Sequence, residues 1–97
     1  MVVAISVFEL HVPEARSLKE KRGVVKSLIE RISARHRVCV LESDFQDLHQ
    51  RSEITLALLG HNQVDVDRVL GRIRDTIEEQ DGCYLTYWQP QFLEAER

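Results

Sequence analysis

The chain has 97 residues, of which 43% are hydrophobic and 30% are charged, a composition typical of a folded globular protein. This length fits one domain, which we expect to span residues 1–97, and it suffices to bury a core without metal or disulfide staples. No apolar run of about 18 residues is present, so the sequence predicts no membrane span. The amino-terminal segment lacks the basic start of a signal peptide, and we therefore expect a cytoplasmic protein.

The net charge of −3 conceals an uneven distribution along the chain. Residues 14–37 carry eight basic and three acidic side chains, whereas the remainder carries five basic and thirteen acidic ones. One segment is therefore strongly positive and the rest is negative. Such an asymmetry orients a protein toward a polyanionic partner.

The first half of the chain predicts a strand, a helix and a short strand. Residues 2–12 are rich in Val, Ile and Phe and are followed by a proline, which ends a strand. Ser17 and Glu20 form a capping box, in which each side chain can accept from the other residue's backbone N–H. A helix is expected to follow, to about Arg35, with an apolar stripe of Leu18, Val25, Leu28, Ile29 and Ile32. Residues 38–41 are the second strand.

The second half predicts a strand, a helix and a strand. A polar connection over residues 42–53 leads to a third strand at 54–59. Asn62 is the expected N-cap of a helix over 64–80, and Asp81-Gly82 ends it. The last strand is expected at 83–89, where Pro90 disturbs or terminates it.

The order β-α-β-β-α-β predicts an α+β, ferredoxin-like βαββαβ sandwich. Right-handed crossovers place both helices on one face of a four-stranded antiparallel sheet, with the first and third strands at its centre. Cys39 and Cys83 then belong to opposite edges, too far apart for a disulfide. We expect two reduced thiols.

The uncovered face of this sheet is also expected to be apolar. In the first strand, Val3, Ile5 and Val7 lie on one face, and apolar side chains occupy the other face as well: Ala4, Phe8 and Leu10. We expect the first set on the open face, with Ile54, Leu56 and Leu58 as neighbours; the inverted assignment stays open. A second copy in a homodimer, or another partner, would cover this face, or it is simply exposed.

No catalytic motif is present. The sequence has no glycine-rich phosphate loop, no G-x-S-x-G and no cysteine–histidine motif. It therefore predicts no cofactor, metal or catalytic residue, and it favours a protein that is not an enzyme. The alternative is a small enzyme or metabolite-binding module, in which the 42–51 connection contributes to a polar site of Glu9, His11, Asp44, Asp47 and His49. Solvated surface residues are the simpler interpretation of that set.

The first helix carries the strongest functional signal. Lys19, Arg22 and Lys26 project within about 60° of one another and suit phosphate groups. Arg16 and Lys21 would assist; because Lys21 lies within the apolar stripe, we expect its stem to pack and its amine to reach water. An ordinary solvated helix is the alternative.

Three segments carry a resemblance to a known family: residues 9–13 (Glu-Leu-His-Val-Pro), 17–22 (Ser-Leu-Lys-Glu-Lys-Arg) and 46–51 (Gln-Asp-Leu-His-Gln-Arg). The chain resembles the YlxP-like bacterial family of small proteins of unknown function. This resemblance implies a ferredoxin-like fold. Family genes often lie near genes for translation initiation and ribosome maturation, which implies a role close to RNA or the ribosome.

The leading hypothesis is therefore a non-catalytic accessory factor that associates with RNA or a ribosomal particle through the basic first helix. One alternative is a small enzyme or metabolite-binding module that uses the polar site. The other is a homodimeric scaffold without nucleic acid.

Overall fold

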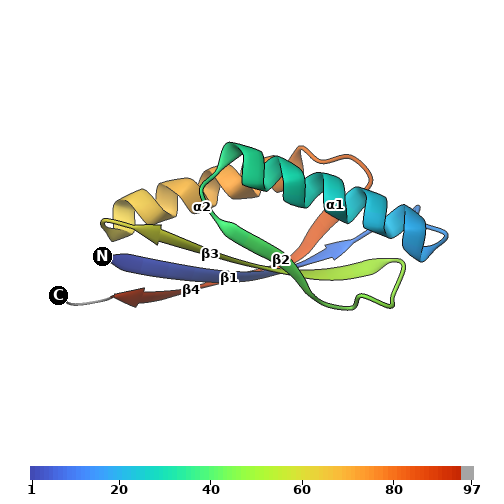
Figure 1. Ribbon diagram of the computed structural model, residues 1–97, viewed down its shortest axis with the longest axis horizontal. Helices are drawn as coiled ribbons and strands as arrows, with labels where there is room; N and C mark the ends of the chain where they lie inside the picture. The colour runs from blue at the N-terminus through green and yellow to red at the C-terminus, as the bar shows by residue number, and fades with distance from the viewer. Residues whose placement is uncertain (95–97) are drawn as a thin grey trace.

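The computed structural model describes residues 1–94 and contains four strands and two helices. Their order is β1 (Val2–His11), α1 (Leu18–Arg35), β2 (Cys39–Asp44), β3 (Arg51–Gly60), α2 (Gln63–Glu78) and β4 (Tyr84–Glu94). The strands form one antiparallel sheet in the order β2-β3-β1-β4. Both helices lie on the same side of this sheet (Figure 1). The ferredoxin-like α+β prediction is confirmed.

Polar side chains start both helices where the sequence predicts. The Ser17 hydroxyl accepts from the backbone N–H of Glu20 at 3.2 Å, and the Asn62 side chain accepts from that of Asp65 at 2.9 Å. The other half of the predicted capping box differs, because the Glu20 carboxylate accepts from the backbone N–H of Arg16 rather than of Ser17. These bonds satisfy N–H groups that have no partner within the helix.

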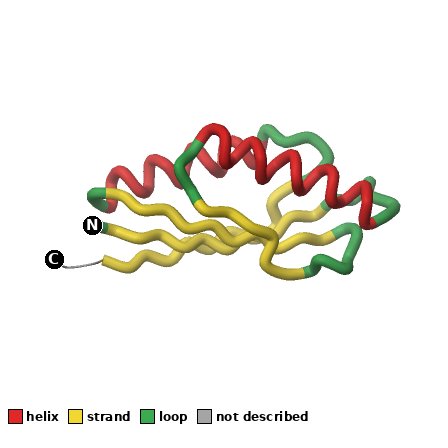
Figure 2. The backbone as a smooth tube through the Cα atoms, viewed as in Figure 1, coloured by secondary structure: helices red, strands yellow, loops and turns green. Residues whose placement is uncertain are grey.

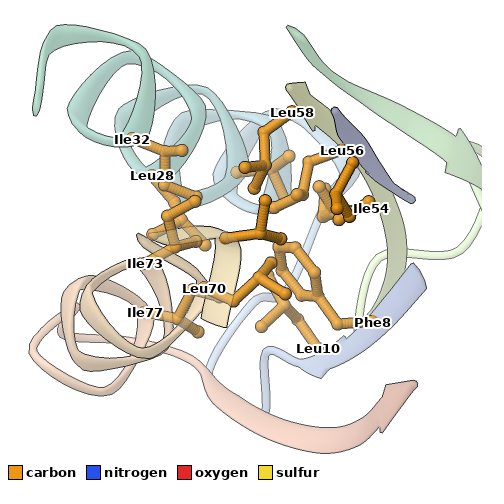
Figure 3. Packing of buried hydrophobic residues seen from close by; sticks show 14 residues of the cluster. Phe8, Leu10, Leu28, Ile32, Ile54, Leu56, Leu58, Leu70, Ile73 and Ile77 are labelled. Atoms are coloured by element: carbon orange, nitrogen blue, oxygen red, sulfur yellow. The ribbon is translucent and has the colours of Figure 1, made fainter. Parts of the chain in front are cut away.

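The hydrophobic core fills the space between the helices and the inward face of the sheet. Figure 3 shows strand residues meeting helix residues there, among them Phe8, Leu10, Ile54, Leu56, Leu28, Ile32, Leu70, Ile73 and Ile77. The apolar stripe of α1 supplies Leu28 and Ile32, and that of α2 supplies Leu70, Ile73 and Ile77, as their spacing predicts.

The strand register settles which side chains occupy the open face. Phe8 lies opposite Ile54 and Ala4 opposite Leu58, and cross-strand partners share a face. Val3, Ile5 and Val7 are therefore on the open face, as expected. The expectation that Ile54, Leu56 and Leu58 accompany them is wrong, because those three residues belong to the core; the neighbours on β3 are Leu59, Ala57 and Thr55.

Half of the predicted 42–53 connection belongs to the sheet. β2 continues to Asp44 and β3 begins at Arg51, so only residues 45–50 connect them (Figure 2). The side chains here are polar because they bond across the two strands: Thr55 Oγ1 donates to Ser43 Oγ at 2.7 Å, and Ser52 Oγ donates to Glu42 Oε2 at 2.5 Å. Polarity alone did not distinguish this hairpin from a loop.

The two edge strands explain the remaining differences. β4 continues through Pro90 to Glu94, because an edge strand tolerates a residue without an N–H where that group would face away from the sheet. Cys39 starts β2 and Cys83 directly precedes β4, so the two cysteines lie at opposite edges, as predicted, and both are free thiols.

Candidate functional site

The outward side of α1 carries a basic surface, which we define as Lys19, Arg22 and Lys26. All three residues are exposed, because they lie off the buried stripe of the helix. Lys26 is 3.9 Å from Glu30, with both side chains more than two-thirds exposed, a contact worth little in water. Within residues 1–94, Lys19 and Arg22 make no ion pair. Arg16 is exposed just before the helix. These cations are available to an anionic partner.

Lys21 differs from its neighbours, and the expectation that its amine reaches water is wrong. Its side chain has no exposed surface. The amine donates to the Glu42 carboxylate at 3.0 Å and to the backbone carbonyls of Phe45 and Arg51 at 2.7 and 3.2 Å. A buried ammonium group requires such partners, because an unpaired charge in the interior is costly. Lys21 therefore connects α1 to the β2–β3 hairpin and is not part of the basic surface.

The hairpin end is shaped around this buried amine. Phe45 has a φ of 62°, a left-handed conformation, and its backbone N–H donates to the Asp44 carboxylate at 2.7 Å. The guanidinium of Arg51 lies 4.2 Å from the centre of the Phe45 ring, and it also pairs with the Glu9 carboxylate at 2.6 Å. Sequence reasoning missed Glu42 and Arg51 as members of this arrangement. The available signal was the lysine itself, since a cation within an apolar stripe calls for a buried acidic partner.

The structure brings together part of the predicted polar site. His11, Asp47 and His49 line one shallow hollow of about 290 Å³, together with Arg51. Glu9 reaches it only through its ion pair with Arg51. Asp44 caps the backbone of Phe45 and is absent from the lining.

The chemistry of this hollow is limited. The His11 ring stacks on Tyr84, with ring centres 5.2 Å apart. No group of three or more His, Cys, Asp or Glu side chains suited to a metal occurs in the described part of the chain. Two imidazoles, the Asp47 carboxylate and the Arg51 guanidinium line the hollow, and such groups can form hydrogen bonds with a small polar ligand.

The arginines of α2 form a contrasting set. Arg68 pairs with Asp65 at 3.7 Å and Arg74 pairs with Glu78 at 3.3 Å. Acidic side chains at helical spacing therefore neutralise much of this surface. The basic surface of α1 is the more strongly positive of the two.

Two titratable groups with shifted pKa values lie away from the basic surface and from the hollow. Burial lowers the pKa of His36, at the end of α1, because it disfavours the charged ring; the nearby guanidinium groups of Arg35 and Arg72 lower this pKa further. Burial raises the pKa of the Cys83 thiol.

Comparison with known proteins places this α+β sandwich in a family. The chain belongs to the family described as "Protein of unknown function (DUF503)", whose model matches residues 3–89. It is 29% identical over 72 residues to "Uncharacterized protein YlxP" from Bacillus subtilis (strain 168), and the match covers 74% of this chain and 78% of that protein. The resemblance to the YlxP-like family is confirmed.

Similar solved structures have low sequence identity to this chain. The de novo designed protein Foldit4 is 12% identical, with a TM-score of 0.55, and the match covers 99% of this chain and 100% of that protein. SnoaB, a cofactor-independent oxygenase from Streptomyces nogalater, is 13% identical with a TM-score of 0.45, over 99% of this chain and 93% of that one. The likeness to Foldit4 concerns the fold alone.

In residues 1–94, neither helix is long and apolar enough to cross a bilayer.

Proposed function

We propose that the protein is a non-catalytic accessory factor of the cytoplasm that associates with RNA or ribosomal assemblies through the basic surface of α1. One observation carries this proposal: Lys19, Arg22 and Lys26 are exposed on one side of a helix, and their only ion pair with another residue of 1–94 is the long, exposed contact of Lys26. Phosphate groups would replace the counterions of such a surface, which favours binding.

The charge distribution supports the same surface. Residues 14–37 have a charge of +5 against −8 in the rest of the chain, so the field of the protein directs this segment toward a polyanion. The sheet is a poorer candidate for reading single-stranded RNA. Proteins that use a sheet in this way stack bases on aromatic side chains of the central strands, and β3 has none.

The experiment compares two triple variants that change charge equally. In the first, Lys19, Arg22 and Lys26 become Glu; in the matched control, Arg68, Arg72 and Arg74 of α2 become Glu. Affinity for a single-stranded ribosomal RNA fragment, and sedimentation with ribosomal particles, are measured at several salt concentrations. We expect the first variant to lose binding and the control to retain most of it.

Salt dependence adds a quantitative check. Three phosphate contacts predict a slope of about −2 in a plot of log affinity against log salt, from about −0.7 per contact for single strands. Equal losses in the two variants, or an affinity that does not change with salt, would contradict the proposed surface. Absence of any association would refute the proposal.

The hollow lined by His11, Asp47 and His49 supports a second candidate, a module that binds a small anionic metabolite. Two imidazoles and a guanidinium line it, although the Asp47 carboxylate lines it too and Arg51 is already paired with Glu9. A ligand-induced rise in melting temperature that His49→Ala abolishes would favour this candidate. A homodimeric scaffold without nucleic acid is the third proposal, and it depends on the open sheet face rather than on α1.

A further inference from the structure

We propose that the open face of the sheet binds a second copy of this chain, with the apolar halves of the two faces in contact. The apolar half consists of Val3, Ile5, Val7, Leu41, Leu59 and Leu93. The strand register brings these residues together, because Val3 lies opposite both Leu59 and Leu93, and Val7 and Leu41 both lie opposite Thr55. The two helices cover only the other face (Figure 1).

The exposed apolar area suits a weak, concentration-dependent dimer. Leu41, Leu59 and Leu93 each expose about 60% of their surface and Ile5 exposes 37%. These four side chains present on the order of 400 Å², taking about 200 Å² for a large side chain in full; Tyr84 and Tyr87 are half-exposed at the charged end, opposite His11 and Glu9. The largest apolar patch on a typical monomer is about 300–600 Å². Stable interfaces bury about 800 Å² per partner, more than these side chains present, so we expect a dimer that dissociates at low protein concentration.

The charges of this face favour a copy over a nucleic acid. The rows through Val3, Ile5 and Val7 contain no charged side chain on any of the four strands. The charged residues that belong to the strands of this face lie at its other end, where Glu9 pairs with Arg51. Arg37, just before β2, borders the patch at the end near Val3, and a single cation is a poor site for a phosphate backbone. Two copies related by a two-fold axis instead place uncharged rows against uncharged rows, so the contact is self-complementary and avoids like-charge repulsion.

Polar side chains and a hollow border the apolar patch. Gln89 and Gln91 flank it on β4, and such uncharged polar side chains suit the rim of an interface. A hollow of about 370 Å³ opens where β3 extends beyond β2; Val3, Cys39 and Leu59 line it together with Arg37, and it can receive an apolar side chain of the copy. Because α1 lies on the other side of the sheet, this dimer leaves both basic surfaces exposed and does not depend on the proposed function.

The test is the oligomeric state of the full chain. Sedimentation velocity and light scattering from 1 μM to 1 mM should show a concentration-dependent dimer. Changing Leu59 and Leu93 to Lys should weaken association at least about tenfold, since it places four like charges in the interface. The matched control is Val64→Lys: Val64 is 65% exposed on α2, outside the open face, and its change should leave association intact. Circular dichroism confirms that both variants are folded.

Thiol labelling gives a second measurement that needs no variant. Cys39 lies on the open face opposite Ala57, so its alkylation should slow as the dimer forms at higher protein concentration. Cys83 lies at the other edge, and its slower labelling should not depend on concentration. A monomer at every concentration would overturn the proposal, as would equal association of the wild type and the Leu59/Leu93 variant.

Discussion

The inward and outward sides of α1 carry the same type of side chain in opposite environments. Lys21 is fully buried and its amine meets a carboxylate and backbone carbonyls. Lys19, two residues earlier, is exposed and has no ion pair in the part of the chain that the structure describes. The difference shows that a basic segment cannot be treated as one surface. Its buried member stabilises the fold, and only its exposed members are available to a partner.

The largest effect is expected from Lys21→Met. This change leaves the partly buried Glu42 carboxylate without its cation and frees the carbonyls of Phe45 and Arg51, so the free energy of unfolding should fall by about 3 kcal/mol. Lys19→Met is the matched control and should change stability by less than about 0.5 kcal/mol. Urea denaturation measures both. Equal effects would remove the contrast between the two sides of the helix.

A double variant sharpens this comparison. Adding Glu42→Leu to Lys21→Met removes the remaining charge, so part of the lost stability should return. Recovery should be incomplete, because Ser52 Oγ and the hairpin carbonyls still lack partners. A double variant less stable than the single one would show that Glu42 stabilises the hairpin without its cation.

A smaller effect of opposite sign is expected on the outward side from Gly23→Ala. Nothing lies within 4 Å of a Cβ at this position, so the helix should gain about 0.5–1 kcal/mol of stability. At Gly60, by contrast, a Cβ would lie 2.5 Å from Val66 Cγ2, and Gly60→Ala should be destabilising. Thermal unfolding compares the two changes. A loss of stability in Gly23→Ala would mean that the glycine has a role its open surroundings do not reveal.

The smallest effect concerns His36, at the carboxyl end of α1. The folded state holds the pKa of His36 below its ordinary value of about 6.5, so on acidification the unfolded chain takes up this proton first. The contribution of His36 is therefore complete above pH 6.5 and decreases as the pH falls below that value. Because the ring is partly exposed, the loss should be small. His36→Gln should flatten the stability profile between pH 7 and pH 5, and an unchanged profile would contradict this assignment.

Local patterns in the sequence predicted most of the fold. Helical stripes, the Ser17 and Asn62 caps and the order of elements depend on residues near one another in the chain, and all appear in the structure. The errors arose where distant residues decide the outcome. The extent of the β2–β3 hairpin depends on cross-strand hydrogen bonds of polar side chains, and the length of β4 depends on Pro90 lying at an edge.

The candidate site shows the same division. The helical period correctly placed Lys19, Arg22 and Lys26 off the apolar stripe, because that geometry is local. The burial of Lys21 could not be deduced from α1 alone, since its partners come from residues 42–51. Similarly, the sequence suggested His11 and His49 as one polar site, but only the tertiary structure shows that Asp44 lies outside the hollow.

The most direct test of the central claim is the RNA affinity of Lys19→Met and Lys21→Met, measured side by side under conditions in which both variants are folded. Lys19→Met should weaken binding and reduce the magnitude of the salt slope by about 0.7, the loss of one phosphate contact on a single strand. Lys21→Met should leave affinity and slope unchanged, because its amine is buried. A loss of affinity in Lys21→Met that equals or exceeds the loss in Lys19→Met would contradict the account.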